Sequence, residues 1–548
     1  MSAPLLSSQL GSTYIPNEIE LVTIKQHISE HMAELKVLEA RVDLALKAYE
    51  DLRTQYDTLS LKIDQYKALA SPLRRLPTEI LAEIFFYCLP TETNSIISPN
   101  EAPLILTRVC SKWRKIALTT PIIWSTIHIS TPPIDSRNSL TLRDDYISRQ
   151  VECRTKLVFD WIARSGECPL YISIFIPVNS HPVWAGFEKQ VLRCLNSNSH
   201  RWKETNFNMP SRYLSDIFAM DRSKFPMLTS LAITVVDLYL LDRPTLAQRH
   251  GICEASNLTA VSFENIPEDL TQLPLHWARL HTLSLTCGSR SISDVGKVLE
   301  SCKSLFRLHI VATPNSSSSY NKTITLPMLN SLILFDTGCN FLDCLDVPSL
   351  QYIRYHYTYP EGKGTLLSFI PRVANGLQTL ISDFQLLSNE DFLLCLRHCP
   401  NLVNLSSCPK PNLAIFVRVS RTQQTPQRHL NFNDALLDLL CTPDSAGRFF
   451  LPKLQIIDWG TPAHFSDEKL LEFIHLRRDR SSPGVSKLKR IVVLREHESD
   501  NSQMETILKQ FNDKDSFKVD IRYAKPSNSR IVLQVDPRLG LPSQLWLS

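Results

Sequence analysis

The residues with the strongest potential for chemistry lie in the sequence CLRHC, which places Cys395, His398 and Cys399 within five positions. Thiolate and imidazole groups are typical zinc ligands, and a structural zinc site needs four of them from closely spaced pairs. Only Cys408 lies near enough to add a ligand, and two of these cysteines fit the apolar positions of a repeat described below. We therefore expect apolar packing here, and no metal or other cofactor.

Patterns that support catalysis are also weak. The only local glycine cluster is EGKGT at 361–365, and it lacks the G-x-x-x-x-G-K-[ST] spacing that wraps backbone amides around a phosphate. We expect a surface turn at this position. No arrangement of Ser, His, Asp or Glu side chains matches a catalytic motif. The sequence therefore predicts a protein that is not an enzyme.

Composition excludes several other classes of function. The formal net charge of +4 comes from 59 basic and 55 acidic residues, which favours neither nucleic acid nor an anionic membrane as a partner. No run of about 18 apolar residues is present to span a membrane. The start of the chain does not resemble a secretory signal, and the 14 cysteines include no C-x-x-C pair, so we expect reduced thiols. These features favour the cytoplasm, the nucleus or both. The basic clusters at 476–480 and 487–490 fit either a nuclear address or solvated loops.

The N-terminal part of the chain is expected to contain a tail and one long helix. Residues 1–17 have no hydrophobic periodicity, so we expect a flexible tail. Residues 18–70 contain no Pro or Gly, and apolar residues recur every 3.5 positions, which predicts a coiled-coil helix about 75 Å long. Its a positions are Leu21, Ile28, Leu35, Val42, Tyr49, Tyr56, Ile63 and Ala70. Its d positions are Ile24, His31, Leu38, Ala45, Leu52, Leu59 and Tyr66.

Two interpretations of this helix stay open. Residues 21–70 could form a homodimer, or the helix could fold against its own chain. Tyr at a positions and Ala at d positions are mediocre choices for the core of a parallel dimer.

Residues 72–128 predict two or three short helices. Pro72 disfavours helix at the preceding residue, and Pro77 can begin a new one. Two amphipathic faces follow, within residues 76–89 and 106–117, and a third short segment begins at Pro121. A unit this small buries little surface, yet it carries many aromatic and aliphatic residues. Surplus apolar surface of this kind usually forms half of an interface.

These helices carry a specific motif. The sequence LRRLPTEILAEIFFYCLP at 73–90 supplies an L-P-x-E-I-L-x-x-I-F start, and the following residues supply V-C-x-x-W-R-x-I-A and P-x-x-W. The segment closely resembles an F-box, and with the heptad helix before it the chain resembles the large F-box family of mushroom-forming fungi. The loop PTETNSIISPN at 90–100 is longer than in many F-boxes, which fits a tolerated surface insertion.

The resemblance implies that the segment binds a Skp-family adaptor, which joins it to a cullin-RING ubiquitin ligase. Leu76 and Pro77 lie at an exposed helix start and fit the adaptor contact best, whereas core packing explains Ile84 and Val109 equally well. By match to the motif, the residues that form the F-box core or contact the adaptor are Leu76, Pro77, Ile80, Leu81, Ile84, Phe85, Val109, Cys110, Trp113, Ile116, Pro121 and Trp124.

Residues 129–150 are expected to form a linker, and helix and strand patterns alternate over residues 151–548. Ten segments share a leucine, two further residues, an apolar residue, one residue and another apolar residue. The first eight leucines are 21 to 30 residues apart, close to the period of leucine-rich repeats. The ten leucines are Leu228, Leu258, Leu280, Leu305, Leu329, Leu350, Leu377, Leu402, Leu454 and Leu488.

The intervening segments at 291–302 and 388–399 have helical patterns. Residues 151–548 thus resemble an irregular leucine-rich repeat domain, in which the asparagine that usually follows the strand is present only at Asn265. An ordinary α/β domain is the alternative. The expected fold class is multidomain, with an all-α N-terminal part (coiled-coil helix and F-box) followed by an α/β leucine-rich-repeat-like solenoid.

The function expected from this organisation is that of a substrate-receptor subunit of a Skp-cullin-F-box ubiquitin ligase. The F-box would bind the adaptor, and the concave, strand-lined face of the repeats would bind a target protein that the sequence does not identify. One alternative is a non-catalytic scaffold outside any active ligase. A third hypothesis, an enzyme within residues 151–548, has the scarcity of glycine and of motifs against it.

Overall fold

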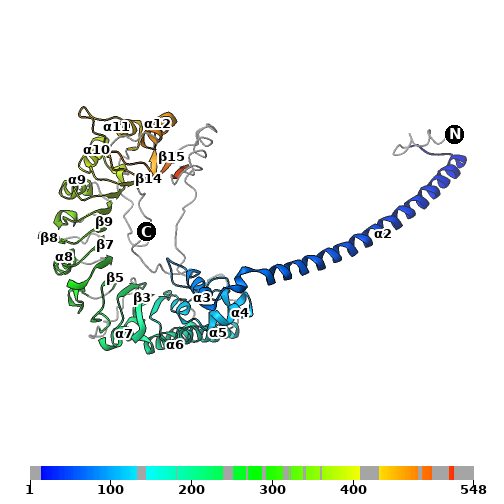
Figure 1. Cartoon of the computed structure of the whole chain (residues 1–548), viewed down its shortest axis with the longest axis horizontal. Coiled ribbons are helices and arrows are strands. Elements are labelled where there is room, and N and C mark those ends of the chain that lie inside the picture. The colour runs from blue at the N-terminus through cyan, green and yellow to red at the C-terminus, as the bar shows by residue number, and fades with distance from the viewer. Residues whose placement is uncertain are drawn as a thin grey trace. The chain divides into compact units, whose positions relative to one another are not determined.

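The computed structural model is divided into two compact units, residues 1–81 and 82–548, which are described separately below (Figure 1). The residues that the structure describes are 14–131, 144–179, 182–237, 251–266, 269–286, 292–312, 320, 322–336, 341–357, 361–407, 431–478, 484–495 and 518–523.

One uninterrupted helix dominates the first unit. Helix α2 (Glu18–Ala70) has 53 residues, and a capping box begins it. The Asn17 side chain accepts a hydrogen bond from the Glu20 amide, and the Glu20 carboxylate accepts one from the Asn17 amide, each at 2.9 Å. The helix ends at Ala70, and Ser71 leaves the helical conformation with a ψ of 128°, as expected from the steric effect of Pro72 on the residue before it. The predicted long N-terminal helix is confirmed.

Short helices follow α2. A 3₁₀ turn, η1 (Pro72–Arg75), leads to α3 (Thr78–Tyr87), which starts in the first unit and continues into the second. The Pro77 carbonyl accepts the hydrogen bond of the Leu81 amide at 3.1 Å, so Pro77 stands immediately before the first turn of α3. The second unit then contains η2 (Ile105–Arg108), α4 (Ser111–Leu118) and η3 (Pro121–Trp124).

A parallel sheet of 14 strands organises the rest of the second unit. Every strand pairs in parallel with the next one along the sheet, and the order in the sheet follows the order in the sequence. The strands are β1 (Thr126–Ser130), β2 (Leu170–Phe175), β3 (Trp202–Met209), β4 (Ser230–Val235), β5 (Ala260–Glu264), β6 (Thr282–Thr286), β7 (Arg307–Ala312), β9 (Ser331–Asp336), β11 (Tyr352–Tyr357), β12 (Thr379–Ser382), β13 (Asn404–Ser407), β14 (Ile456–Ala463), β15 (Arg490–Arg495) and β16 (Lys518–Tyr523). A separate parallel pair joins β8 (Ile324–Thr325) and β10 (Leu345–Asp346).

The ten leucines found in the sequence explain this sheet. Each of them stands two residues before the first residue of a strand, from Leu228 before β4 to Leu488 before β15. None of the ten is more than 4% exposed. The apolar positions of each segment therefore point to one side of the sheet and pack against the next repeat, as a solenoid requires. The predicted α/β repeat architecture is confirmed.

Helices cover one face of the strands, as α8, α9 and α10 show in Figure 1. The helices predicted at 291–302 and 388–399 are α8 and α10. Asn265 has a positive φ of 59° and donates a hydrogen bond to the Val235 carbonyl of the preceding repeat at 3.4 Å. The helices of this region are α5 (Asp144–Arg164), α6 (Trp184–Ser197), α7 (Leu214–Phe218), α8 (Ile292–Glu300), α9 (Glu361–Val373), α10 (Asn389–Arg397), α11 (Asp434–Cys441) and α12 (Asp467–Arg478).

The structure differs from the sequence expectations at several borders. The sheet begins at Thr126, inside the range expected for the F-box, and α5 crosses position 150, where the linker was expected to end. The cluster at 361–365 forms the start of α9 rather than a surface turn. Among the described helices, none has the length and apolar character needed to cross a membrane.

Candidate functional site

The two thiols of CLRHC point into the protein core. Cys395 lies in the last turn of α10 and Cys399 follows just after the helix; both are at most 1% exposed, whereas His398 is exposed. Burial raises the pKa of the Cys399 thiol to about 12 and raises that of Cys395 as well. Such thiols stay protonated and hold a cation poorly. No cluster of metal-ligating side chains occurs within the described ranges, and Cys408 lies outside them.

Arg477, in the basic cluster at 476–480, has a structural role. Its side chain is buried on α12 and donates hydrogen bonds to the carbonyls of Leu440, Phe450 and Leu451 at 2.7 to 3.2 Å. A guanidinium group can satisfy three carbonyls at once because its five N–H groups form a planar fork. Arg477 therefore ties the end of α11 to the loop before β14 and is not part of an accessible basic patch.

Four residues predicted for the helical site form its core. Leu81, Phe85, Ile116 and Trp124 are all at most 4% exposed. The Phe85 ring lies 4.9 Å from the half-buried Trp113 ring, in a tilted arrangement. These contacts join α3 to α4 and leave the opposite sides of both helices to solvent.

Trp124 also completes a helix end. Its indole N–H donates a hydrogen bond of 2.7 Å to the Ala117 carbonyl. Ala117 belongs to the last turn of α4, where carbonyl groups have no partner within the helix. Cys110 has the corresponding role at the other end, since its sulfur accepts the Trp113 amide at 3.4 Å.

Six of the predicted residues remain at the surface. Val109 is 56% exposed, Ile80 is 44% exposed and Ile84 is 38% exposed. Ile80 and Ile84 stand one turn apart on α3, and Tyr87, which is also exposed, continues the same face. The exposed residues are Pro77, Ile80, Ile84, Val109, Cys110 and Pro121.

Motif matching did not single out all of the exposed apolar residues. Phe86, Ile105, Leu118 and Ile122 are each between 39% and 44% exposed. Phe86 widens the apolar face of α3 and so stands out in the sequence, whereas no sequence pattern singles out the other three. Apolar side chains on α3, η2, α4 and η3 are thus available for a partner.

The end of the helical segment is joined firmly to the sheet. η3 leads directly into β1, and the Trp124 ring packs edge-on against Trp161 of α5 with the ring centroids 5.0 Å apart. The Trp161 indole donates to the Thr126 carbonyl at 3.2 Å. Arg164 stacks over the Trp124 ring at 4.8 Å. A small helical unit and the first repeat therefore share one core within the second unit.

The long loop between α3 and η2 covers the first strand of the sheet. The Ser95 carbonyl accepts the His128 amide at 2.7 Å, and Ile96 forms an isolated parallel bridge with His128. The Ser95 and Thr126 hydroxyls are 3.0 Å apart. An exposed edge strand offers unpaired backbone groups to other chains, and this loop occupies part of that edge. The expected surface insertion is therefore a cap on the sheet.

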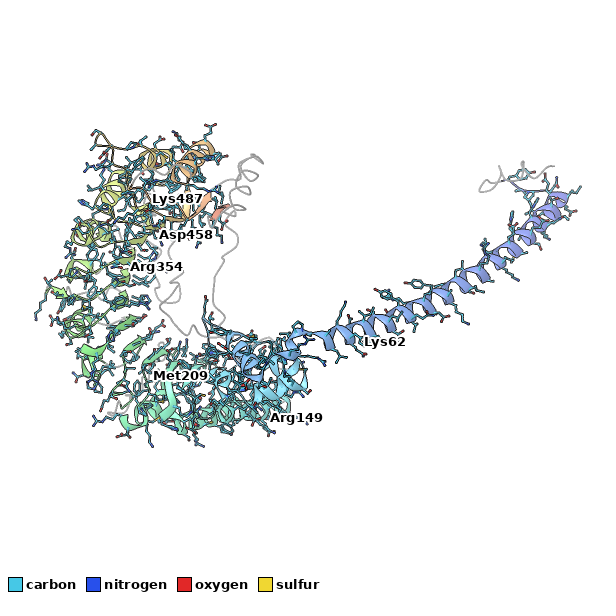
Figure 2. The ribbon with its side chains drawn as sticks, viewed as in Figure 1. Lys62, Arg149, Met209, Arg354, Asp458 and Lys487 are labelled. Carbon is cyan, nitrogen blue, oxygen red and sulfur yellow. The ribbon has the colours of Figure 1, made fainter. Side chains whose placement is uncertain are left out.

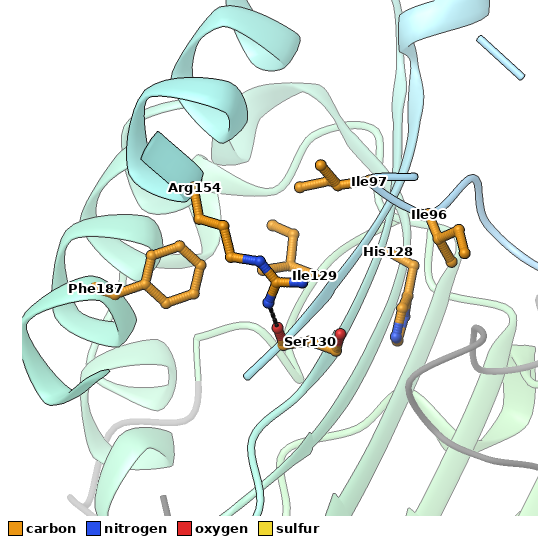
Figure 3. A pocket seen from close by; sticks show the side chains of 7 residues that line it. All are labelled: Ile96, Ile97, His128, Ile129, Ser130, Arg154 and Phe187. Atoms are coloured by element: carbon orange, nitrogen blue, oxygen red, sulfur yellow. Dashed lines mark hydrogen bonds between the residues drawn. The ribbon is translucent and has the colours of Figure 1, made fainter. Parts of the chain in front are cut away.

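A cavity of about 150 Å³ lies beside this cap (Figure 3). Arg154 of α5 reaches into it and donates a hydrogen bond of 2.9 Å to the Ser130 carbonyl. Burial lowers the pKa of Arg154. The other lining residues are Ile96, Ile97, His128, Ile129 and Phe187. His128 Nδ1 lies 2.8 Å from the Ser173 hydroxyl, and both side chains are buried, so this pair joins neighbouring strands β1 and β2 of the sheet.

Comparison with known proteins agrees with the position of this site. A protein-family model described as F-box-like matches residues 73–130. The match includes every predicted site residue from Leu76 to Trp124, and it ends at the last residue of β1. No curated protein matches the chain. The chain therefore contains an F-box-like domain, preceded by a long helix and followed by a leucine-rich-repeat-like sheet.

Proposed function

We propose that the chain is the substrate-receptor subunit of a Skp-cullin-F-box ubiquitin ligase. The observation that carries the proposal is the exposure of the apolar residues Ile80, Ile84 and Val109 inside the F-box-like match. The core of the domain does not use these side chains, and an adaptor that covers them would remove apolar surface from water. The chain itself performs no bond chemistry in this role. The role belongs to the cytoplasm, the nucleus or both.

The mechanism is proximity. A target held on the receptor stands near the ubiquitin-charged enzyme of the ligase, which raises its effective concentration. This requires that the adaptor-binding helices and the target-binding surface keep a fixed separation. The shared core of Trp124 and Trp161, together with the loop cap on β1, supports this proposal, because it joins the helical segment rigidly to the first strand of the sheet.

The target is expected on the face of the sheet opposite the helices. Parallel strands in register place equivalent side chains in rows across neighbouring repeats. One such row runs through Thr282, Arg307, Ser331 and Tyr352 on β6, β7, β9 and β11. Rows of mixed polar, charged and aromatic side chains are better suited to binding the surface of another protein than to binding a small ligand.

Coexpression with a Skp-family adaptor tests the proposal. We expect a 1:1 complex by size exclusion with light scattering, and we expect Ile84→Asp or Val109→Asp to abolish it. Leu394→Asp is the matched control, because Leu394 is a similarly exposed apolar residue (48%) on a distant helix, α10. Folded wild-type protein that leaves the adaptor unbound would refute the proposal. So would loss of binding in Leu394→Asp as well, with all three variants folded.

The scaffold alternative is distinguished by the cullin. A receptor in a working ligase brings the cullin with the adaptor when the complex is purified from cells. A scaffold would bind the adaptor alone or no ligase component.

A further inference from the structure

Helix α2 carries an apolar seam that is open to solvent along its length. Leu35, Leu52 and Leu59 are 56%, 65% and 59% exposed, and the large aliphatic and aromatic residues on both sides of them are similarly open. A helix usually buries such a stripe against another element, because removing each leucine side chain from water is substantially favourable in free energy. The seam holds its 3.5-residue period from Leu21 to Ala70, which is the pattern of a helix that pairs with another helix.

We propose that α2 pairs with α2 of a second copy of this chain, and that the two helices run antiparallel. In an antiparallel pair each a position faces a d position of the other helix. The positions of this seam allow one register with full overlap, in which the residue numbers of facing core residues add up to 87. The twofold axis then passes between Asp43 and Leu44, close to the middle of α2.

Core packing favours this orientation over the parallel one. In a parallel pair each residue faces its own copy, so His31 would meet His31, and the tyrosines would meet each other in three layers. In the antiparallel register Tyr49 and Tyr66 face leucines and Tyr56 faces His31, so no tyrosine or histidine meets its own copy, which fills the layers more evenly. The facing pairs are Leu21 with Tyr66, Ile24 with Ile63, Ile28 with Leu59, His31 with Tyr56, Leu35 with Leu52, Leu38 with Tyr49 and Val42 with Ala45.

The charged residues on both sides of the seam also favour the antiparallel orientation. In a parallel pair, each g residue faces the e residue five positions later on the other helix. That places Glu34 opposite Glu39 and Lys62 opposite Lys67, and each of these clashes occurs twice by symmetry. Only Glu20 with Lys25 would attract.

The antiparallel register removes both clashes. Glu34 then faces Gln55, and Glu39 faces Leu46. Glu18 faces Lys67, so an acidic residue at the start of α2 meets a basic residue at its end. No two carboxylates and no two ammonium groups stand opposite each other. Flanking charges commonly set helix orientation, and here they select one of the two.

The two orientations differ greatly in the distance between the N-termini. In a parallel dimer they lie side by side, whereas in the antiparallel dimer the length of α2 separates them by about 80 Å. The full chain is therefore made with a donor or an acceptor fluorescent protein fused before Met1, and the two forms are mixed. We expect the mass of a dimer by light scattering, together with low energy transfer. A dimer with high energy transfer would overturn the orientation, and a monomer would overturn the proposal.

Charge reversal supplies an independent test with opposite signs for the two orientations. Lys67→Glu places a carboxylate opposite Glu18 in the antiparallel dimer but opposite Lys62 in a parallel one. We expect about a three- to tenfold rise in the dimer dissociation constant, and recovery when Glu18→Lys is added. Tighter association of Lys67→Glu would show a parallel dimer and refute the proposal. Leu52→Asp is the seam control and should give monomers, so a persistent dimer would place the interface elsewhere.

Discussion

Trp124 joins the F-box-like helices to the sheet, and replacing it with Phe tests how that junction is stabilised. Phe keeps an aromatic ring against Trp161 and below Arg164, but it lacks the indole N–H that reaches the Ala117 carbonyl. Ala117 is fully buried, so no water replaces the lost donor easily. A buried carbonyl left without a partner costs about 1–3 kcal/mol.

Loss of ring volume adds a second contribution that must be separated from the first. Removing buried atoms costs roughly 24 cal/mol per Å³ of remaining cavity, so a cavity of about 40 Å³ adds about 1 kcal/mol. Trp184→Phe supplies the matched control. Trp184 is also buried, its ring meets Phe187 edge-on at 5.3 Å, and Arg154 lies over it at 5.8 Å. Among the described contacts its indole N–H has no hydrogen bond, so the control carries only the volume contribution.

Urea unfolding of the full chain, followed by far-ultraviolet circular dichroism, gives the free energy of unfolding for both variants. We expect Trp124→Phe to lose about 1–3 kcal/mol more than Trp184→Phe. Hydrogen exchange should place the additional loss in α4 and β1. Equal losses in the two variants would refute the conclusion that the indole N–H stabilises the end of α4.

Two further predictions concern the repeats. Burial, with a smaller contribution from Arg354, lowers the pKa of His309 to about 4. Because unfolded histidine titrates near pH 6.5, the unfolded chain binds more protons below that pH, and stability should fall by about 2 kcal/mol from pH 7 to pH 5. Urea unfolding at both pH values should show this slope in the wild type and a flatter one in His309→Gln; equal slopes would contradict the assignment. Gly251→Ala should lower the melting temperature, because a Cβ there would overlap the Met220 carbonyl, whereas Gly186→Ala, with open space inside α6, should raise it slightly. Thermal unfolding of both variants distinguishes these outcomes, and a stabilised Gly251→Ala would contradict the close approach.

The repeat strands were predictable because one physical requirement repeats in the sequence. Each leucine must be buried two residues before its strand, and ten such leucines recur along the chain. Two strands outside that leucine pattern, β1 and β16, are not predicted from the sequence. β1 lies at the end of a segment expected to form short helices, and no sequence pattern marks β16. Their pairing depends on a neighbouring strand that already exists, which is a tertiary effect.

The residues of the candidate site were predictable from the motif. Their division into buried core residues and exposed surface residues was not. Phe85 and Ile84 are adjacent in the sequence and equally apolar, yet Phe85 is buried and Ile84 is 38% exposed. Helical periodicity gives the faces of a helix but not which face meets the rest of the protein. The role of the loop around Ser95 was also hidden, because its contacts are to backbone groups of β1, more than 30 positions away.

The order of the strands has a consequence for how the protein is made. Each strand of the sheet pairs with the strand before it in the sequence, and the first one is capped by a loop that precedes it. A ribosome therefore releases β1 with its cap already synthesised, and each later strand emerges next to a completed template. Contacts between neighbouring repeats close loops of only some 20 to 30 residues across most of the sheet, so growth from one end involves little loop-closure entropy at each step. We expect assembly to follow synthesis from the N-terminal end, with one growing edge at any time.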